Sequence, residues 1–402
     1  MDEEIDKIRE EIDCTDAELL RLLNRRMELA IEVGRIKASM GLPLFHPERE
    51  QIIFQRLSKL NPGPLSEESL RSIYREVFAA SRLIQYRLQV AFLGPEWTNS
   101  HLASISLFGH SASYLPCASL EEVFDSFLKG KAHLAVIPIE TSLHGGVGHS
   151  MDLLYERQVH VISECYLEIA HYLCSNAQGL DDIKRLYGHP QAIDQCRRWL
   201  LENIGHAEHI ECSSTARSAL LAKQDLNGAA ICNLYAAQRH GLGILAERIE
   251  ESPGNAARFL ALGNYCNPPT GNDKTSLLFA VSDRPGSLLA ALGALSSINM
   301  TRIESRPNRL FSWQYLFYAD IEGHRDDSPV RAALDVLAKN VTFLKILGSY
   351  PKSDPAQPFR IEKEKMRTGA KPQDKPPEAE GPGQSGPAPR RRNYSGGGHE
   401  RA

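Results

Sequence analysis

The feature that most constrains this chain is the helical pattern of its first ninety residues. From residue 5 to about residue 37, apolar residues recur at steps of three and four with no proline among them, which predicts one long amphipathic helix. A break at Gly41-Leu42-Pro43 precedes a second predicted helix over Pro47–Leu60, and a third is expected from Ser66 to about residue 88. Helices with one apolar face need partners that cover it.

The pattern changes near Gln89, where short apolar runs begin to alternate with helical stretches. This alternation predicts an α/β domain whose functional surface lies at strand ends, where loops such as 138–148 converge. The expected strands are 90–93, 134–137, 160–162 and 229–232, and the expected helices include 120–128 and 193–201.

A third block follows the sequence Asn267-Pro268-Pro269-Thr270-Gly271. Its pattern predicts a βαββαβ order of the ferredoxin-like kind. The expected elements are strands at 275–281, 300–305, 313–321 and 343–347, with helices at 285–295 and 329–337. Residues 352–402 are rich in Pro, Gly and charged residues and nearly free of large apolar ones, so we expect a disordered tail.

Composition narrows the functional classes. A length of 402 residues favours two to four domains, and a net charge of -4 gives no general attraction to nucleic acid or anionic membrane. The eight cysteines form no CxxC pair, which favours reduced thiols over a zinc site, and we expect no cofactor. With no apolar leader and no window of eighteen uncharged apolar residues, the expected location is the cytoplasm.

Cationic residues in the helical region follow the helix period. Arg26 and Lys37 are eleven residues apart, about three turns, and so project from nearly the same face. Arg9 is seventeen residues from Arg26, about 100° away, and must serve a different cavity or the same kind of cavity in a partner chain. Ser81 and Gln85 share a face at i, i+4. Helical spacing alone favours solvated side chains and ordinary surface ion pairs at these positions.

Residues 1–89 resemble the all-helical chorismate mutase domain that begins the bifunctional P-proteins, which join a chorismate mutase to a prephenate dehydratase. The resemblance runs through IREEID, LLNRRMELA, VGRIK, HPERE and SRLIQ. It implies that Arg9 reaches into the active site of a second subunit, so that the protein is a homodimer or a higher homo-oligomer. His46 stands where the family often has Asp. The residues implied for the local site are Arg26, Lys37, Arg49, Glu50, Ser81 and Gln85.

The implied reaction, chorismate to prephenate, explains the residue types. A Claisen rearrangement of a dicarboxylate needs no nucleophile or metal, only a compact bound conformer and stabilisation of charge. Arginines can hold carboxylates with two hydrogen bonds. As the ether bond breaks, negative charge grows on its oxygen, where the Lys37 ammonium and the Gln85 amide would bind it.

Residues 90–266 resemble prephenate dehydratase, a two-lobed, periplasmic-binding-like domain with its cleft between the lobes. The resemblance lies in GPEWTNS, PIETS, GHPQA, STA and NAARF. It implies that Arg258 holds a substrate carboxylate and that Glu140 orients the site. The implied cleft residues are Thr98, Ser100, Glu140, Ser142, Ser150, Ser214, Thr215, Arg258 and Phe259.

Five positions depart from the family pattern: Trp97, Asn99, Thr141, Gly188 and Ala257. Ala257 replaces a threonine that the resemblance connects with protonation of the departing ring hydroxyl, and an alanine has no proton to give. Three interpretations stay open. The cleft still makes phenylpyruvate with another hydroxyl as donor (Thr98, Ser100, Ser142, Ser150 or Thr215), it decarboxylates prephenate, or it is a catalytically degenerate scaffold.

Residues 273–351 resemble the ACT domain of the same family, in KTSLLF, in the turn around Gly286 and in the ESRP motif. The resemblance implies amino acid binding between subunits, with backbone N–H groups after Gly286 receiving a carboxylate and the ESRP loop closing over it. L-phenylalanine is the expected inhibitor. A non-catalytic amino acid sensor is the remaining alternative. The implied residues are Gly286, Ser287, Leu288, Glu304, Ser305, Arg306 and Pro307.

Overall fold

The computed structural model describes residues 2–40, 45–85, 88–308 and 314–360. The predicted break at Gly41-Leu42-Pro43, the start of the strand expected from Trp313, and residues 361–402 of the expected tail lie outside these ranges.

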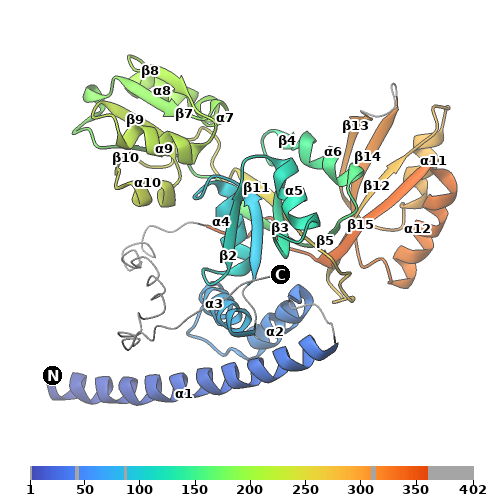
Figure 1. The fold of residues 1–402 in the computed structure, drawn as a ribbon, viewed down its shortest axis with the longest axis horizontal. Helices are drawn as coiled ribbons and strands as arrows, with labels where there is room; N and C mark the ends of the chain where they lie inside the picture. Colours follow the sequence, from blue (N-terminus) through green and yellow to red (C-terminus); the bar gives the residue numbers. More distant parts are fainter. Residues whose placement is uncertain (1, 41–44, 86–87, 309–313, 361–402) are drawn as a thin grey trace, which may run out of the picture. The chain divides into compact units, whose positions relative to one another are not determined.

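Three helices form the N-terminal region, as predicted: α1 (Asp2–Met40), α2 (Pro47–Leu60) and α3 (Glu67–Gln85). Figure 1 shows α1 as a single long helix. Gly34 of α1 packs directly against the side-chain stem of Gln85, and a Cβ at position 34 would come within 2.7 Å of Gln85 Cγ. The close contact between α1 and α3 therefore depends on this glycine.

Most of the apolar face of α1 is uncovered within the described chain. Every large hydrophobic side chain from Ile5 to Leu23 on this helix is more than a third exposed. Packing of such a face against another surface supplies most of the stability of an amphipathic helix. The exposed side chains are Ile5, Ile8, Ile12, Leu19, Leu20, Leu22, Leu23, Leu29, Val33, Ile36 and Met40.

The first lobe of the α/β region has a sheet in the order β2-β1-β3-β11-β5, with β4 paired to β3. Strands β2, β1 and β3 are parallel, and β11 runs antiparallel between β3 and β5. The strands are β1 (Gln89–Leu93), β2 (Ser113–Cys117), β3 (Leu134–Thr141), β4 (Gly145–Gly146), β5 (His160–Glu168) and β11 (Ala256–Gly263). The helices are α4 (Asn99–Phe108), α5 (Leu120–Leu128) and α6 (Gly148–Glu156).

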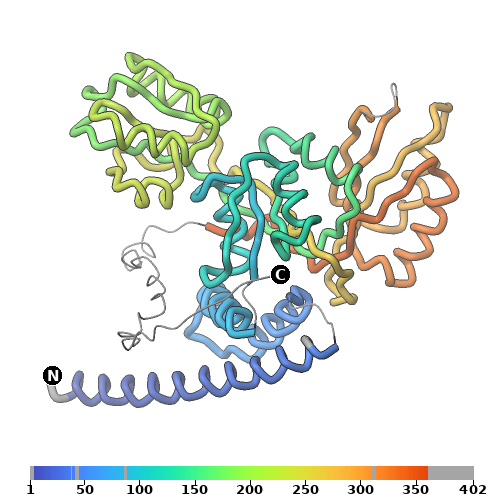
Figure 2. The backbone as a smooth tube through the Cα atoms, in the orientation of Figure 1, coloured from blue at the N-terminus to red at the C-terminus, as the bar shows by residue number. Residues whose placement is uncertain are grey.

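The second lobe has its own sheet, in the order β10-β6-β9-β7-β8. The chain enters it after β5 and leaves it before β11, and both crossings can be followed in Figure 2. The strands are β6 (Tyr172–Ser175), β7 (Arg185–Gly188), β8 (Glu208–Glu211), β9 (Gly228–Cys232) and β10 (Gly243–Ala246). The helical elements are η1 (Leu180–Asp182), α7 (Pro190–Gln195), α8 (Arg197–Ile204), α9 (Thr215–Lys223) and α10 (Leu234–His240).

One predicted helix in this lobe is wrong. The stretch 193–201 belongs to two helices, α7 and α8, which meet at Cys196. The backbone of Cys196 is not helical (φ -110°, ψ 8°), and its thiol is fully buried in the core of the lobe beside Leu200. Burial of this side chain fixes the bend that the periodicity did not reveal.

The C-terminal region has the predicted βαββαβ order and an antiparallel sheet in the order β13-β14-β12-β15. Helices α11 and α12 lie side by side against this sheet (Figure 1). The elements are β12 (Asp273–Ala280), α11 (Ser287–Ala294), β13 (Met300–Pro307), β14 (Tyr315–Glu322), α12 (Ser328–Asn340) and β15 (Phe343–Pro351).

The predicted start of the disordered tail at residue 352 is wrong, because contacts with the first lobe are made within residues 352–360. The backbone N–H of Phe359 donates to the Tyr166 carbonyl at 2.8 Å, and the Phe359 carbonyl accepts from the Glu168 N–H at 3.0 Å. The segment thus adds to β5, the edge strand of the first lobe. Satisfying that edge favours an ordered segment despite its polar composition.

A shared core joins the first lobe to the C-terminal sheet. Leu260 and Met151 of the lobe pack in one cluster with Leu278, Tyr318 and Leu347 of the sheet. Five of the eight cysteines are buried, all eight are free thiols, and Cys14 and Cys266 are exposed. Among the described helices, none is long and apolar enough to cross a membrane.

Candidate active sites

In the helical region, the structure brings Arg26 and Ser81 together. Arg26 Nη1 donates to Ser81 Oγ, and the Ser81 hydroxyl donates to the Val77 carbonyl at 2.7 Å. The Arg26 guanidinium also lies 5.3 Å from the centre of the Phe78 ring. Burial lowers the pKa of Arg26, so this cation lies in an environment that favours an anionic partner.

Glu50 and Lys37 belong to the same electrostatic cluster. Burial raises the pKa of the Glu50 carboxyl, although the Arg82 guanidinium, which donates to its Oε1, pulls it down. Burial likewise lowers the pKa of Lys37, opposed by the charges of Glu48 and Glu50. Arg82 was not predicted as a site residue. The signal for it was its position next to Ser81 in SRLIQ.

Two predicted residues lie apart from this cluster. Arg9 is exposed and pairs with Asp6 at 3.2 Å. Seventeen residues of helix separate it from Arg26, roughly 25 Å along the axis, so it cannot reach the local cluster. Arg49 is exposed, and His46, the departure from the family pattern, pairs with Glu48 at 2.7 Å.

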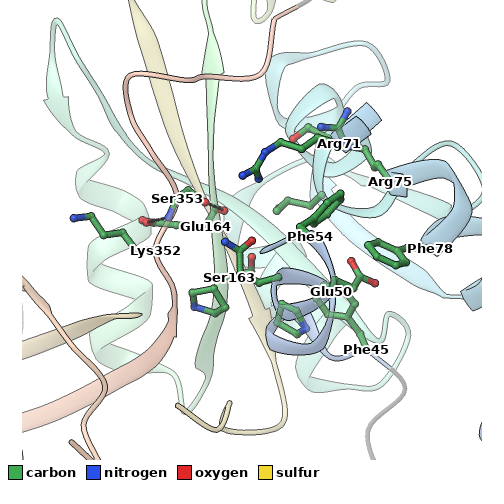
Figure 3. Close-up of a pocket in the computed structure, with 15 residues that line it drawn as sticks. Phe45, Glu50, Phe54, Arg71, Arg75, Phe78, Ser163, Glu164, Lys352 and Ser353 are labelled. Carbon is green, nitrogen blue, oxygen red and sulfur yellow. Dashed lines mark hydrogen bonds between the residues drawn. The ribbon is translucent and has the colours of Figure 1, made fainter. Parts of the chain in front are cut away.

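Glu50 also lines a hollow of about 160 Å³ between the helical region and the first lobe. Figure 3 shows Phe45, Phe54 and Phe78 beside Glu50 on the helical side. Glu164, Lys352 and Ser353 lie on the other side (Figure 3). Glu50 therefore faces both the cationic cluster and this junction.

Among the described residues, side-chain contacts join the two lobes where the sequence predicts the cleft. The Trp97 ring stacks on Tyr235 of the second lobe, with ring centres 6.0 Å apart, and the Trp97 carbonyl accepts from Asn233 Nδ2 at 2.9 Å. His144 Nδ1 lies 3.0 Å from Gln191 Nε2. Trp97 has φ 68°, a left-handed conformation that is strained for a large side chain. A bulky aromatic residue thus occupies the point where the lobes meet.

Several of the predicted cleft hydroxyls already make hydrogen bonds within the protein. Thr98 caps α4, accepting from the His101 N–H and donating to the Leu93 and Pro95 carbonyls. Ser142 Oγ donates to Asn255 Oδ1 at 2.9 Å and accepts from the Ala256 N–H.

The other predicted cleft residues fall into two groups. Ser214 caps α9 through its hydroxyl, and Thr215, the first residue of that helix, is half-buried. Ser100, Ser150 and Phe259 are buried, and Ser150 has no accessible surface, so the expectation that Ser150 lines the cleft is wrong.

Arg258 and Glu140 face the C-terminal sheet, which corrects their predicted roles. Arg258 Nε donates to Glu164 at 2.7 Å, and Nη1 donates to Glu140 at 2.8 Å and to Asp320 at 2.5 Å. Nη2 donates to the Tyr350 hydroxyl at 3.0 Å. Because the guanidinium is only 2% exposed and is bound to protein carboxylates, the expectation that it holds a substrate carboxylate is wrong.

Arg258 and Glu140 face the C-terminal sheet because side chains alternate between the two faces of β11 and β3. Ala257 packs in a cluster that Trp97 covers, so the next residue, Arg258, points to the opposite face. A bulge near Ile139 sets the register in which Glu140 opposes Arg258 and Thr141 opposes Ala257. Thr141 therefore shares the cleft face with Ala257.

In the C-terminal region, Gly286 has φ 82° and precedes α11, as its predicted role requires, and Ser287 Oγ lies 3.0 Å from Ser282 Oγ. Leu288 and Arg284 line a hollow there with Tyr315.

The expectation that the ESRP motif forms a loop over this hollow is wrong. The motif lies in the edge strand β13. Arg306 pairs with Asp152 of α6 at 3.2 Å, and Glu304 pairs with Arg302, which also pairs with Glu140 at 2.8 Å. Ser305 and Pro307 point to the exposed side. Pairing with β14 makes the motif a strand, and its alternate side chains dock on the first lobe.

No cluster of three or more potential metal ligands occurs among the described residues. Cations, hydroxyls and a shielded carboxyl are the chemical groups that the sites offer. These suit binding of an organic anion with charge stabilisation and proton transfer.

Comparisons with known proteins agree with this division of the chain. The chorismate mutase type II family model matches residues 8–86, and the prephenate dehydratase model matches residues 90–267. The chain is 39% identical over 357 residues to the bifunctional chorismate mutase/prephenate dehydratase of Aquifex aeolicus, covering 87% of this chain and 99% of that protein. It is 37% identical over 359 residues to the Stutzerimonas stutzeri protein of the same description, covering 87% and 98%.

A solved structure is similar to about two thirds of the chain. The prephenate dehydratase of Arthrobacter aurescens in complex with L-Phe matches with a TM-score of 0.62 and 34% identity. The match covers 68% of this chain and 93% of the Arthrobacter chain.

Proposed function

The chain belongs to the family of bifunctional chorismate mutase/prephenate dehydratases, and we propose how its residues carry out the two reactions and their regulation. The helical region converts chorismate to prephenate, and the two-lobed region converts prephenate to phenylpyruvate, as steps toward L-phenylalanine. The observation that carries this proposal is the cationic cluster of Arg26, Lys37 and Arg82 around the shielded carboxyl of Glu50, inside the segment that matches the mutase model.

In the mutase reaction, Arg26 binds a carboxylate of chorismate, and Ser81 orients the guanidinium through their hydrogen bond. Lys37 and Gln85 stabilise the charge that develops on the ether oxygen. The raised pKa of Glu50 keeps this carboxyl protonated to a higher pH than usual, so it serves as a hydrogen-bond donor beside that oxygen.

The mutase site is completed by a second copy of the chain. The exposed apolar face of α1 packs against α1 of the partner, which covers the hydrophobic side chains that the single chain leaves in solvent. Arg9, too distant to reach its own cluster, then enters the cluster of the partner subunit. Assembly and catalysis thus depend on the same helix.

Co-expression of two inactive variants tests this arrangement. Arg9→Ala and Arg26→Ala each abolish mutase turnover in a homodimer, but a mixed dimer has one site with both arginines if Arg9 acts across the interface. Random pairing makes half of the dimers mixed, and each mixed dimer has one intact site out of two. About a quarter of wild-type activity therefore returns. If Arg9 acts within its own chain, no activity returns, and the proposal is wrong.

In the dehydratase reaction, prephenate binds between the lobes at the cleft bridged by Trp97, Tyr235 and Asn233. The hydroxyl-lined side of this cleft supplies a proton to the departing ring hydroxyl as the ring carboxylate leaves as carbon dioxide. Formation of phenylpyruvate from added prephenate tests this step. A decarboxylated but non-aromatic product supports the decarboxylase alternative, and an unchanged substrate supports a degenerate scaffold.

The C-terminal region is an ACT-type regulatory domain that binds L-phenylalanine near Gly286. Backbone N–H groups at the start of α11 receive the carboxylate, and Leu288 and Tyr315 line the adjoining hollow for the ring. The L-Phe complex of the similar Arthrobacter dehydratase supports this ligand. Calorimetric titration with phenylalanine, tyrosine and tryptophan tests the assignment, and equal affinity for all three would contradict it.

A further inference from the structure

The proposed dehydratase reaction needs a proton donor in the cleft, and the hydroxyls there are not equally free to act. The departing hydroxyl becomes water only if a proton reaches its oxygen as the C–O bond breaks. Ala257 has no donor. The donor must therefore be a hydroxyl that faces the cleft and whose hydrogen is not already held by a protein acceptor.

Four of the hydroxyls predicted from the sequence fail this requirement. The hydrogen of Thr98 is held by the Leu93 and Pro95 carbonyls, and that of Ser142 is held by Asn255. Ser100 is 7% exposed and Ser150 is fully buried. Each of these hydroxyls thus stabilises the first lobe or is shielded from a ligand.

Thr141, which was not among the predicted donors, meets the requirement. It ends β3 directly opposite Ala257 of β11, and directly opposed residues of antiparallel strands point to the same face with Cβ atoms about 4.5–5.5 Å apart. Its neighbour Glu140 points to the other face, toward Arg258. Thr141 is half-buried, so part of the residue is accessible to solvent.

A backbone contact orients the Thr141 hydroxyl. Thr141 Oγ1 accepts a hydrogen bond from the His144 N–H at 3.1 Å, and within the described part of the chain it donates none. The bond fills one lone pair and leaves the hydroxyl hydrogen free to turn toward a ligand. It also stabilises negative charge on Oγ1, as an N–H directed at a developing oxyanion does. His144 in turn contacts Gln191, so the hydroxyl is held where the two lobes meet.

We propose that Thr141 is the catalytic proton donor of the dehydratase site, an assignment that rests on the proposed dehydratase function. The bond between the ring and its carboxylate breaks, and its electron pair completes the aromatic ring. The C–O bond breaks with its electron pair on oxygen, which takes the Thr141 proton and leaves as water. Thr141 Oγ1 then regains a proton from solvent water, and the carboxylate departs as carbon dioxide.

Three variants of the full chain test the assignment. Thr141→Val keeps the shape but removes the hydroxyl, and kcat for phenylpyruvate formation falls by at least about 100-fold with little change in KM, the loss expected for a general acid. Thr141→Ser keeps both the hydroxyl and the acceptor for His144 and retains kcat within a few-fold. In Thr141→Val with Ala257→Thr, the hydroxyl moves to the opposite strand and restores turnover. Mutase activity of each variant reports that the chain is folded.

Thr215→Val is the matched comparison, because Thr215 is a half-buried hydroxyl of the second lobe. We expect Thr215→Val to alter KM more than kcat. The solvent deuterium isotope effect on kcat should persist in this variant. Wild-type kcat in Thr141→Val, or a loss of kcat in Thr215→Val alone, overturns the assignment. If the wild-type chain makes no phenylpyruvate while its mutase step works, the proposed dehydratase function itself fails and the assignment falls with it.

Discussion

Replacing Arg258 by Met removes the cation on which the junction between the first lobe and the C-terminal sheet depends. The guanidinium is bound to Glu164, Glu140 and Asp320, of which the Glu164 side chain is 0% exposed and that of Asp320 5%. Lys274 still pairs with Glu164 at 2.8 Å after the change, but among the described residues Asp320 keeps the Ser276 hydroxyl as its one close side-chain donor. One carboxylate is then buried without a direct cationic partner.

Breaking a buried pair in this way costs about 3–5 kcal/mol. For a cooperative unit of 150 to 250 residues, each kcal/mol lowers the melting temperature by roughly 2–4 °C, so calorimetry should record a fall of about 6–20 °C. The control is Arg198→Met, whose pair with Glu202 is 78% and 59% exposed and should cost less than about 1 kcal/mol. Adding Asp320→Asn to Arg258→Met removes the unpaired charge and should recover part of the loss.

The penalty also depends on pH. Burial raises the pKa of Asp320, but the charges of Arg258 and Arg302 outweigh it and hold the pKa below its usual value. A depressed carboxyl pKa contributes stability above the unfolded value of about 4, and this is lost as pH falls through the folded value. Without Arg258 the pKa of Asp320 rises, so the difference between wild type and variant is largest near neutral pH and shrinks in acid. A cost no larger than that of Arg198→Met, or one that grows in acid, refutes this reasoning.

Three further outcomes are expected. Gly348→Ala places a Cβ against the backbone carbonyl of Val161, which cannot swing away, and should cost about 1–3 kcal/mol in thermal unfolding. Gly179→Ala, whose Cβ meets nothing closer than 4.0 Å, should cost almost nothing, and equal costs would contradict the close contact between β15 and β5. Burial lowers the pKa of His101 to about 4, so its contribution to stability is fully present above the unfolded pKa of about 6.5 and falls by about 3 kcal/mol between pH 6.5 and 4. His101→Asn keeps an acceptor for the Trp97 N–H and should flatten this pH dependence in calorimetry at stepped pH values. An unchanged slope would exclude His101 as the source of the dependence. Mutase activity should decline as rising pH ionises the Glu50 carboxyl, whose pKa is raised. The Glu50→Gln variant stays neutral and should keep its activity at higher pH. Parallel pH profiles of the two proteins would contradict the role of Glu50 as a hydrogen-bond donor.

Local sequence patterns predicted an element well where residues at its own ends determine where it begins and stops. The bounds of α2, Pro47–Leu60, were predicted from the proline at its start and the Asn61-Pro62-Gly63 sequence after it. The βαββαβ order was also predicted. The bend at Cys196 and the strand character of ESRP were missed, because both depend on contacts with residues distant in sequence.

The mutase cluster was more predictable than the cleft. Arg26 and Ser81 project from faces that helix spacing defines, and the structure brings them into contact. In the two-lobed region, the bulge near Ile139 decides which of Glu140 and Thr141 lies on the same face of the sheet as Ala257. A one-residue shift reverses the two faces of a strand, and no local pattern shows where a bulge lies. The role expected of Arg258 was wrong for the same reason.

The order of residues 352–360 could not be predicted from composition. Phe359 packs into the core of the first lobe, and the Arg75 guanidinium lies 4.9 Å from the centre of its ring. One aromatic residue in a polar segment is a weak signal. Its effect comes from the edge of β5, which is completed only after the sheet has formed.

The most direct test of the central claim is the fate of chorismate incubated with the purified chain. Chorismate should disappear, prephenate should rise first, and phenylpyruvate should follow, with the first step lost in Arg26→Ala and the second in Thr141→Val. Chorismate that stays unchanged in the presence of the folded wild-type chain would contradict the account.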